Sequence, residues 1–366
     1  MTRINPGRRD RLTEGITVRL FVYEFVCGGG WSDRPVDGSL LAEGRAMQRA
    51  AVEDFTRIPG CSVVTTSDGR WNRSAPDDVA VVPIADPVQE RSLFRQLAAQ
   101  CDATFVIAPE CHGILSERRR WVAEVDGTFL GPSQSAIDLC TDKRQLAGHL
   151  NAQAIPTIPA EPVDQPFSSD GLAFPMVIKP RDGAGSQQTF LVRTQGELER
   201  AVRSLAESDE PFEAIAQPYV AGRSLSLAVL ISGDNSHHVF CPPAEQRLSD
   251  DGRFRYLGGR APVAVESAHE IPSLIERCLR AIPGLRGYVG FDLIQPSGPS
   301  SRDPLIVEIN PRLTTSYLGY RELTPDNLAE RMLFPDRTFP ELSWQNEPVE
   351  WQIQNAKGGV DMTDCF

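Results

Sequence analysis

The first third of the chain alternates short apolar runs with amphipathic segments. Residues 16–26 are apolar, with many β-branched and aromatic side chains, and they end in a glycine turn. Apolar residues at helical spacing follow over 39–54, and two more apolar runs cover 79–84 and 103–108, with a helical pattern between them. Short apolar runs predict buried strands, and strands that alternate with helices predict a parallel sheet. We therefore expect a parallel α/β layer up to about residue 135.

The next block is predicted to hold short elements joined by loops. A helix that starts at Lys143 has its N-cap at Thr141 or Asp142. After this helix we expect, in order, a surface loop over 156–174, a strand over 176–179, a loop of small residues over 181–188, a return strand over 189–192 and a helix opened by a capping box at 194–197.

The last third differs, because most of its strands follow one another without helices between them. Apolar segments predict a helix over 269–282 and strands over 213–219, 225–231, 237–241, 288–294 and 305–309. Successive strands favour an antiparallel sheet with helices on one face, which is an α+β arrangement. Residues after about 340 show little periodicity, and we expect a surface extension there.

The fold class predicted from this order is α/β plus α+β. We divide the chain into a flexible N-terminus (1–15), an N-terminal α/β domain (16–135), a small subdomain (136–212), a larger C-terminal subdomain with a metal site (213–340) and a C-terminal extension (341–366).

Composition narrows the choice of partners. The 366 residues include 37 Lys and Arg against 49 Asp and Glu, which gives a net charge of −12. Such an acidic chain is not built to coat nucleic acid or an anionic membrane, and no apolar run reaches the roughly 18 residues of a membrane span. The eight cysteines form no CxxC pair, and no apolar signal-type stretch follows the polar first residues. We therefore expect reduced thiols and a cytoplasmic protein.

Oxygen-bearing side chains gather on the last two predicted strands. Glu308 and Asn310 point to the same side of their strand because side chains alternate faces. The polar connection 295–303 suits a hairpin that brings Asp292 across from them. Such oxygens suit Mg²⁺, with Mn²⁺ as an alternative, and a site with few protein ligands leaves positions for substrate phosphates. The alternative is an ordinary solvated sheet face.

A second candidate site surrounds Lys179, which ends an apolar strand beside a proline and is expected to face a cleft. Glycines in the next loop allow backbone amides to approach a phosphate, and a serine adds a hydroxyl donor. The loop is neither a Walker A sequence nor a dinucleotide fingerprint, and a plain hairpin turn is the alternative. Its candidate residues are Asp182, Gly183, Ala184, Gly185 and Ser186.

A third candidate is the extended segment 216–222, which ends in a glycine. It fits equally an ordinary strand end and a hinge whose backbone faces an adenine edge.

The order of these features resembles the ATP-grasp superfamily over about residues 135–325. The resemblance implies two α+β subdomains that clasp ATP, and the α/β block ahead of them resembles the N-terminal (pre-ATP-grasp) domain of such enzymes. It assigns Lys143, Lys179 and the 182–186 loop to the phosphates, Gln217, Tyr219 and Val220 to the adenine site, and Asp292, Glu308 and Asn310 to Mg²⁺.

Two positions depart from the family pattern. The hinge usually begins with Glu and here has Gln217, and the position that often holds a ribose-binding Glu is Ser224. The resemblance therefore supports the metal site more firmly than the choice of nucleotide.

Shorter motifs look like the tyramine–glutamate ligase group, which works in methanofuran-type cofactor biosynthesis. They are Tyr-Glu-Phe at 23–25, three glycines at 28–30, Pro-Ala-Glu-Gln-Arg at 243–247, Tyr-Leu-Gly-Gly-Arg at 256–260 with Pro262, and the run 310–317. The resemblance implies a carboxylate–amine ligase that takes ATP, a small acid and a small amine, and members of the family are often dimers, which leaves a homodimer open.

The mechanism that follows from these parts uses an acyl phosphate, which an amine converts to an amide. Arg312 lies just past the metal strand, and its planar fork suits a carboxylate or phosphoryl group. Arg260, between a Gly-Gly pair and an alanine, is a second catalytic candidate, with a surface loop arginine as the alternative. Two other functions stay open at this point: an ATP-grasp kinase, and a non-catalytic nucleotide-binding sensor.

Overall fold

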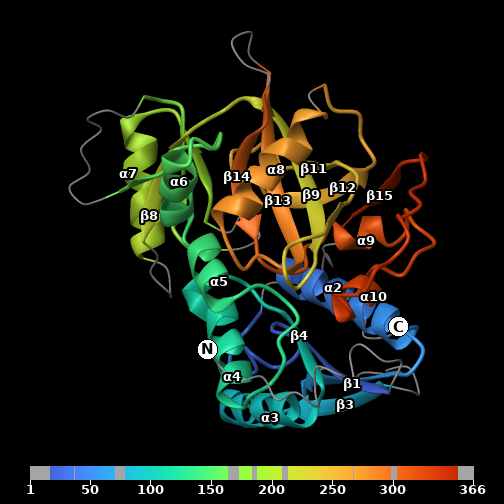
Figure 1. Ribbon diagram of the computed structural model, residues 1–366. Helices are drawn as coiled ribbons and strands as arrows, with labels where there is room; N and C mark the ends of the chain where they lie inside the picture. Colours follow the sequence, from blue (N-terminus) through green and yellow to red (C-terminus); the bar gives the residue numbers. More distant parts are fainter. Residues whose placement is uncertain are drawn as a thin grey trace.

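The computed structural model describes residues 17–36, 38–70, 79–163, 173–183, 188–207, 213–266, 268–297 and 303–352. These residues form three sheets, and Figure 1 shows the N-terminal sheet at the bottom with the other two above it. Among the helices of the described ranges, none is both long and apolar enough to cross a membrane.

The N-terminal sheet is parallel, as the alternating pattern predicted. Its strands are β1 (Val18–Glu24), β2 (Cys61–Asp68), β3 (Val79–Ile84) and β4 (Ala103–Ile107), in the order β3-β2-β1-β4, with helices α2 (Gly38–Thr56), α3 (Pro87–Gln100) and α4 (Ile114–Glu124). β2 was not predicted, because its buried positions include the polar residues Thr65, Thr66 and Ser67.

The small sheet is antiparallel in its described pairings and has the order β5-β8-β6-β7. Its strands are β5 (Glu161–Pro162), β6 (Met176–Pro180), β7 (Phe190–Val192) and β8 (Ala214–Pro218), and α7 (Gln195–Ala206) packs on it. The predicted caps are confirmed: Asp142 caps α6 (Lys143–Ala152), and Thr194 caps α7.

One strand assignment was wrong. We expected the strand at about 213–219 in the large C-terminal sheet, but β8 pairs with β6 of the small sheet. The chain crosses to the large sheet only after Pro218, through residues 219–221. Apolar patterning cannot separate the two sheets here, because a strand on either side of the crossing has the same buried character.

The large sheet is antiparallel in its described pairings, as predicted. Its order is β14-β13-β9-β11-β12-β15, with β10 on β9, and its strands are β9 (Gly222–Ile231), β10 (His238–Phe240), β11 (Ala244–Leu248), β12 (Tyr256–Ala261), β13 (Gly287–Pro296), β14 (Leu305–Asn310) and β15 (Val349–Trp351). One face packs against α5 (Gln134–Thr141), α6 and α8 (Glu270–Ala281). The other face shares a core with α2, β1 and β2 of the N-terminal sheet.

The expected surface extension after residue 340 is corrected by β15. This strand pairs with β12 and buries Trp351, whose indole lies where side chains of Gly259 and Gly319 would stand. The indole Nε1 donates a hydrogen bond to the Tyr256 hydroxyl at 2.7 Å. A strand of three residues is too short for its alternation to appear in the sequence.

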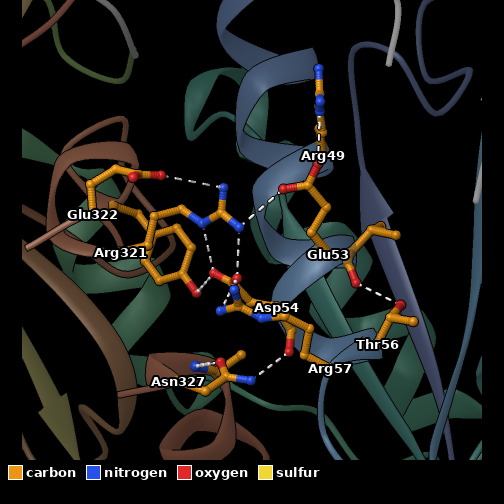
Figure 2. A network of polar contacts seen from close by, with 11 residues as sticks. Arg49, Glu53, Asp54, Thr56, Arg57, Arg321, Glu322 and Asn327 are labelled. Carbon is orange, nitrogen blue, oxygen red and sulfur yellow. Dashed lines mark hydrogen bonds and ion pairs between the residues drawn. The ribbon is translucent and has the colours of Figure 1, made fainter. Parts of the chain in front are cut away.

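A polar network joins α2 to the two short helices α9 (Tyr317–Tyr320) and α10 (Leu328–Leu333) (Figure 2). The buried Asp54 carboxylate accepts hydrogen bonds from the Tyr317 hydroxyl at 2.6 Å and from Arg321 Nε at 2.9 Å and Nη2 at 2.7 Å. Asn327 donates to the Asp54 carbonyl oxygen at 2.7 Å, and Glu53 also pairs with Arg321. We call this set, Glu53, Asp54, Tyr317, Arg321 and Asn327, the α2 clamp.

Candidate active site

A cavity of about 680 Å³ lies where the small sheet, the large sheet and α2 meet. Its walls come from the β6–β8 part of the small sheet, from β9, β11, β13 and β14 of the large sheet, and from one face of α2. Residues from α2, the small sheet and the large sheet, which are far apart in the chain, therefore line one cavity.

The hairpin β13–β14 brings the predicted metal residues together. Asp292 lies opposite Glu308 in the antiparallel register, and Gly290 lies opposite Asn310. Asn310 Nδ2 donates to Asp292 Oδ2 at 3.0 Å, and Gln246 Nε2 from β11 donates to Asp292 Oδ1 at 2.9 Å. The predicted hairpin is confirmed, and Gln246 contacts it although no role was predicted for this residue.

The two carboxylates of this hairpin differ in charge. Burial raises the pKa of Asp292 to about 7, and the negative charge of Glu308 acts in the same direction. Burial also acts to raise the pKa of Glu308, but the charges of Lys143 and Lys179 outweigh it and lower that pKa to about 2. Glu308 is therefore ionised at neutral pH, while Asp292 is ionised only in part, and a further positive charge nearby would favour its ionised form.

This donor set fits a magnesium ion. Hard oxygen ligands are what Mg²⁺ takes in proteins, and it commonly uses one or two carboxylates together with substrate phosphates and water. Within the described residues, no three His, Cys, Asp or Glu side chains gather as a metal-binding group. A cation here would therefore be held by Asp292, Glu308 and the amide of Asn310, with its other positions open.

Two buried lysines stand beside Glu308. Lys179 Nζ donates to Glu308 Oε1 at 2.8 Å, and Lys143 Nζ lies 3.8 Å from the same oxygen. Lys143 Nζ also donates to the carbonyl oxygen of Gly183 at 2.8 Å. Burial lowers the pKa of Lys179, and Glu308 opposes that change. Two cations against one carboxylate leave positive charge at the start of the glycine loop, where an anion would be favoured.

The predicted hinge links the two sheets. Gln217 is buried, and its Nε2 donates to the carbonyl oxygen of Ile158 at 3.1 Å. Tyr219, Val220 and Ser224 line the cavity, together with Gln217. The segment is thus both the end of β8 and the crossing into β9.

The glycine loop is only partly described, because Ala184, Gly185 and Ser186 lie outside the described residues. Gly183 lines the cavity, whereas Asp182 is not among the lining residues. Asp182 instead accepts a hydrogen bond from the backbone N–H of His112 at 2.6 Å. His112 belongs to η2 (Cys111–Gly113), so Asp182 anchors the start of the loop to the N-terminal domain.

The two candidate arginines have different surroundings. Arg312 lines the cavity, and both carboxylate oxygens of Glu110 contact one edge of its guanidinium: Nε lies 2.7 Å from Oε1, and Nη2 donates to Oε2 at 2.8 Å. Arg260 is exposed on β12, and its Nη2 lies 3.5 Å from Glu245 Oε2. Arg260 is not among the residues that line the cavity, because it points away from the buried side of its strand.

Several cavity residues carried no signal in the sequence. Glu43 and Met47 reach the cavity from α2, and Glu110 reaches Arg312 from the turn after β4. We call Lys143, Lys179, Asp292, Glu308 and Asn310 the hairpin end of the cavity. We call Glu43, Met47, Arg312, Thr314 and Thr315 its α2 end.

Comparison with known families agrees with this architecture. Residues 140–316 match the family model described as the ATP-grasp domain, and residues 61–137 match the pre ATP-grasp 3 domain. The first range contains the small sheet and the hairpin end, and the second covers much of the N-terminal sheet.

Individual proteins are similar as well. A tyramine–L-glutamate ligase of Methanocaldococcus fervens is 24% identical over 336 residues, which is 91% of this chain and 99% of that protein. A D-alanine–D-alanine ligase of Moorella thermoacetica is 32% identical over 180 residues, 45% of this chain and 53% of that one. The crystal structure of an ATP-grasp superfamily protein from Archaeoglobus fulgidus matches with a TM-score of 0.64 at 22% identity, covering 89% of this chain and 90% of that chain.

The fold and the two domain matches define an ATP-grasp enzyme with a pre-ATP-grasp N-terminal domain. It is a ligase of that class. Within the class, it resembles the tyramine–L-glutamate ligases over nearly its full length.

Proposed function

We propose that the protein uses ATP to join a carboxylic acid to an amine through an acyl phosphate, with release of ADP and phosphate. The observation that carries this proposal is the content of one cavity: buried lysines and paired carboxylates at the hairpin end, and a partly buried arginine at the α2 end. Phosphoryl transfer to a carboxylate needs charge neutralisation and alignment more than a covalent nucleophile, and this cavity offers both.

The nucleotide is assigned to the hinge and to the hairpin end. Gln217, Tyr219, Val220 and Ser224 would line the adenine and ribose. Lys143 and Lys179 would bind the phosphates, because both ammonium groups already face one carboxylate in a buried place. The 182–186 loop, with Asp182 as its anchor on the N-terminal domain, would cover them.

A magnesium ion held by Asp292, Glu308 and Asn310 would neutralise phosphate charge as the γ-phosphoryl group is transferred. The protein groups prepare that binding, since Lys179 keeps Glu308 ionised and Asn310 holds one oxygen of Asp292. Mn²⁺ offers the same preference for oxygen ligands.

Arg312 would bind the acid. Its guanidinium is held by Glu110 and by the carbonyl oxygen of Leu313, so its orientation is set in advance and less side-chain entropy is lost when the acid binds. The substrate carboxylate oxygen attacks the γ-phosphorus and ADP leaves. The amine then attacks the acyl carbon, the C–N bond forms, and the C–O bond to phosphate breaks.

The particular substrates that we propose are L-glutamate and tyramine or a related amine, in the biosynthesis of a one-carbon cofactor. The support is the near full-length similarity to proteins named tyramine–L-glutamate ligase. Identity of 23–24% leaves room for a change of substrate, so the acid and the amine are tested separately.

The test is magnesium-dependent release of ADP and phosphate, with mass spectrometry of the products. We expect release that requires both L-glutamate and tyramine, and a new amide mass. Release with other acid–amine pairs alone would keep the ligase and reject this pair. A stable phosphorylated product that forms without any amine would reject the ligase in favour of a kinase.

A further inference from the structure

The carboxylates that line the cavity differ in their position and in their partners. Lining residues with a carboxylate are Glu43, Glu245, Asp250, Asp292 and Glu308. Glu308 bonds to Lys179, and Asp292 accepts from Asn310 and Gln246. Glu245 pairs with Arg223 and Arg260, and Asp250 is exposed at the tip between β11 and β12. Glu43 differs from these four because it comes from α2, at the end of the cavity that holds Arg312.

The reaction proposed above creates a need for such a group. A primary amine is protonated at neutral pH, as a lysine side chain is. Lys143, Lys179 and Arg312 suit phosphates and a carboxylate, but they would repel an ammonium group. The amine must nevertheless reach the acid that we assign to Arg312, so it needs an anion that offsets this repulsion and lies away from the lysines.

We propose that Glu43 binds the ammonium group of the amine substrate and accepts its proton, which makes the α2 end of the cavity the amine subsite. This inference rests on the proposed function: it adds that Glu43 is the residue that binds the amine, and that the ammonium group is the part of the amine that it binds. Met47 lies one helical turn after Glu43 on the same face of α2 and also lines the cavity. The amine that fits is a primary amine whose carbon chain packs against Met47.

Electrostatics at this end agree with the placement. Burial and Glu110 act on the pKa of Arg312 in opposite directions, and Asp292 and Glu43 add to the raising effect of Glu110. Burial raises the pKa of Tyr256 to about 12, and the charge of Glu43 contributes to that rise. Glu43 is thus within electrostatic reach of the arginine that we assign to the acid and of a tyrosine that lines the same cavity.

The α2 clamp keeps Glu43 in place. Asp54 lies eleven positions after Glu43, which is about three helical turns, so the two residues share one face of α2. Through Asp54, that face is hydrogen-bonded to Arg321, as Figure 2 shows, and also to the Tyr317 hydroxyl. Thr314 and Thr315, which line the cavity, come just before Tyr317 in the chain. The clamp therefore sets the distance between the carboxylate on α2 and the opposite wall of the subsite.

The chemical step is balanced by this assignment. The bound ammonium gives one proton to Glu43, and the freed lone pair forms the C–N bond with the acyl carbon. The C–O bond to phosphate breaks, and its electron pair leaves with the phosphate. The nitrogen then gives its second proton to the departing phosphate, which leaves the neutral amide, and Glu43 returns its own proton to solvent as the products leave.

The test compares an amine with the alcohol of the same shape. Tyramine and tyrosol, in which a hydroxyl replaces the ammonium group, are titrated calorimetrically into the full-length protein in the presence of MgADP. Wild type is expected to bind tyramine about 10- to 100-fold more tightly than tyrosol, as a charged hydrogen bond provides. Glu43→Gln should bind both equally, and Glu43→Asp should recover part of the preference.

Steady-state kinetics gives the second readout. In Glu43→Gln the KM for the amine should rise about 10- to 100-fold, while the KM values for ATP and for the acid stay within about twofold of wild type. The matched control is Glu124→Gln, on α4, where the carboxylate pairs with Arg95 outside the cavity. It should behave as wild type in both assays.

The outcomes separate this inference from the proposed function. If wild type shows no preference for tyramine over tyrosol, or if Glu43→Gln keeps the preference, the role of Glu43 is wrong even when amide forms. If no acid–amine pair yields an amide while the preference depends on Glu43, the subsite stands and the ligase reaction is rejected.

Discussion

At one end of the cavity Asp292 and Glu308 face each other across a single hairpin, whereas at the other end Arg312 is held by Glu110, 202 residues away in the chain. The hairpin end is therefore a local structure whose geometry follows from strand register. The α2 end exists only when the N-terminal domain is docked on the large sheet. Substitutions at the hairpin end should therefore abolish only the phosphate chemistry. Substitutions at the α2 end should alter how the N-terminal domain contacts the large sheet.

The sharpest test of the hairpin end is removal of its charges. Asp292→Asn and Glu308→Gln should each lower magnesium-dependent ADP release by about 10²–10³-fold, because each replaces a carboxylate ligand of the proposed metal site by a neutral amide. The melting temperature should change little by comparison. ADP release that stays at the wild-type level in both variants would show that the metal assignment is wrong.

The next largest effect is expected at the α2 end. Glu110→Gln should reduce kcat/KM for the acid by about 10- to 100-fold, since Arg312 loses the partner that fixes its orientation. The KM for ATP should remain near the wild-type value, because Glu110 does not line the hairpin end. If ATP and acid KM rise together, the two ends are not separable in the way we describe. Glu117→Gln, an exposed Glu on α4, is the matched control.

The α2 clamp gives the largest effect on stability. Asp54→Asn should lower the unfolding free energy by about 3 kcal/mol, the lower end for breaking a buried ion pair, because Glu53 still pairs with Arg321. Denaturant unfolding measures this change. Amine binding should weaken more than MgADP binding in the same variant, and an equal loss of both would contradict a clamp that acts on the α2 end.

The smallest effect is expected at Asp142, the N-cap of α6, whose carboxylate also pairs with Arg181 just ahead of the glycine loop. Burial alone would raise the pKa of Asp142, but hydrogen bonds from Arg181 and Gln145 lower it overall. A carboxylate with a lowered pKa stabilises the fold above its unfolded pKa of about 4, and the gain is lost as pH falls through the folded value. Asp142→Asn keeps the helix cap, so it should cost about 1 kcal/mol at pH 7 and progressively less as the pH falls below about 4. A difference that persists in acid would assign the loss to the cap instead.

The same division explains what the sequence could predict. Glu308 and Asn310 are two positions apart on one strand, and Asp292 lies one hairpin away, so the alternation of a strand was enough to bring them together. The parallel and antiparallel sheets followed from equally local patterns. The pairing of β8 with the small sheet could not be predicted from local patterns, because it depends on which strands the tertiary fold brings together.

Glu43 and Glu110 could not be predicted in this way. Each is one acidic residue in an ordinary helix or turn, and its role depends on a contact between distant segments. Arg260 is the opposite case. Its Gly-Gly-Arg motif suggested a catalytic residue, but the side chain is exposed on β12 and does not line the cavity. Its two glycines have a packing reason instead, since Trp351 and its backbone occupy the space beside them.

That packing has a practical consequence for anyone who shortens the protein or fuses a tag to it. Cutting the chain ahead of Val349 would remove β15 and leave the hydrogen-bonding groups of β12 as a free sheet edge. It would also empty the space beside Gly259 and Gly319 that the indole fills. Exposed edges of this kind pair with other chains, so such a shortened protein should aggregate, whereas a tag attached beyond residue 352 keeps the edge covered.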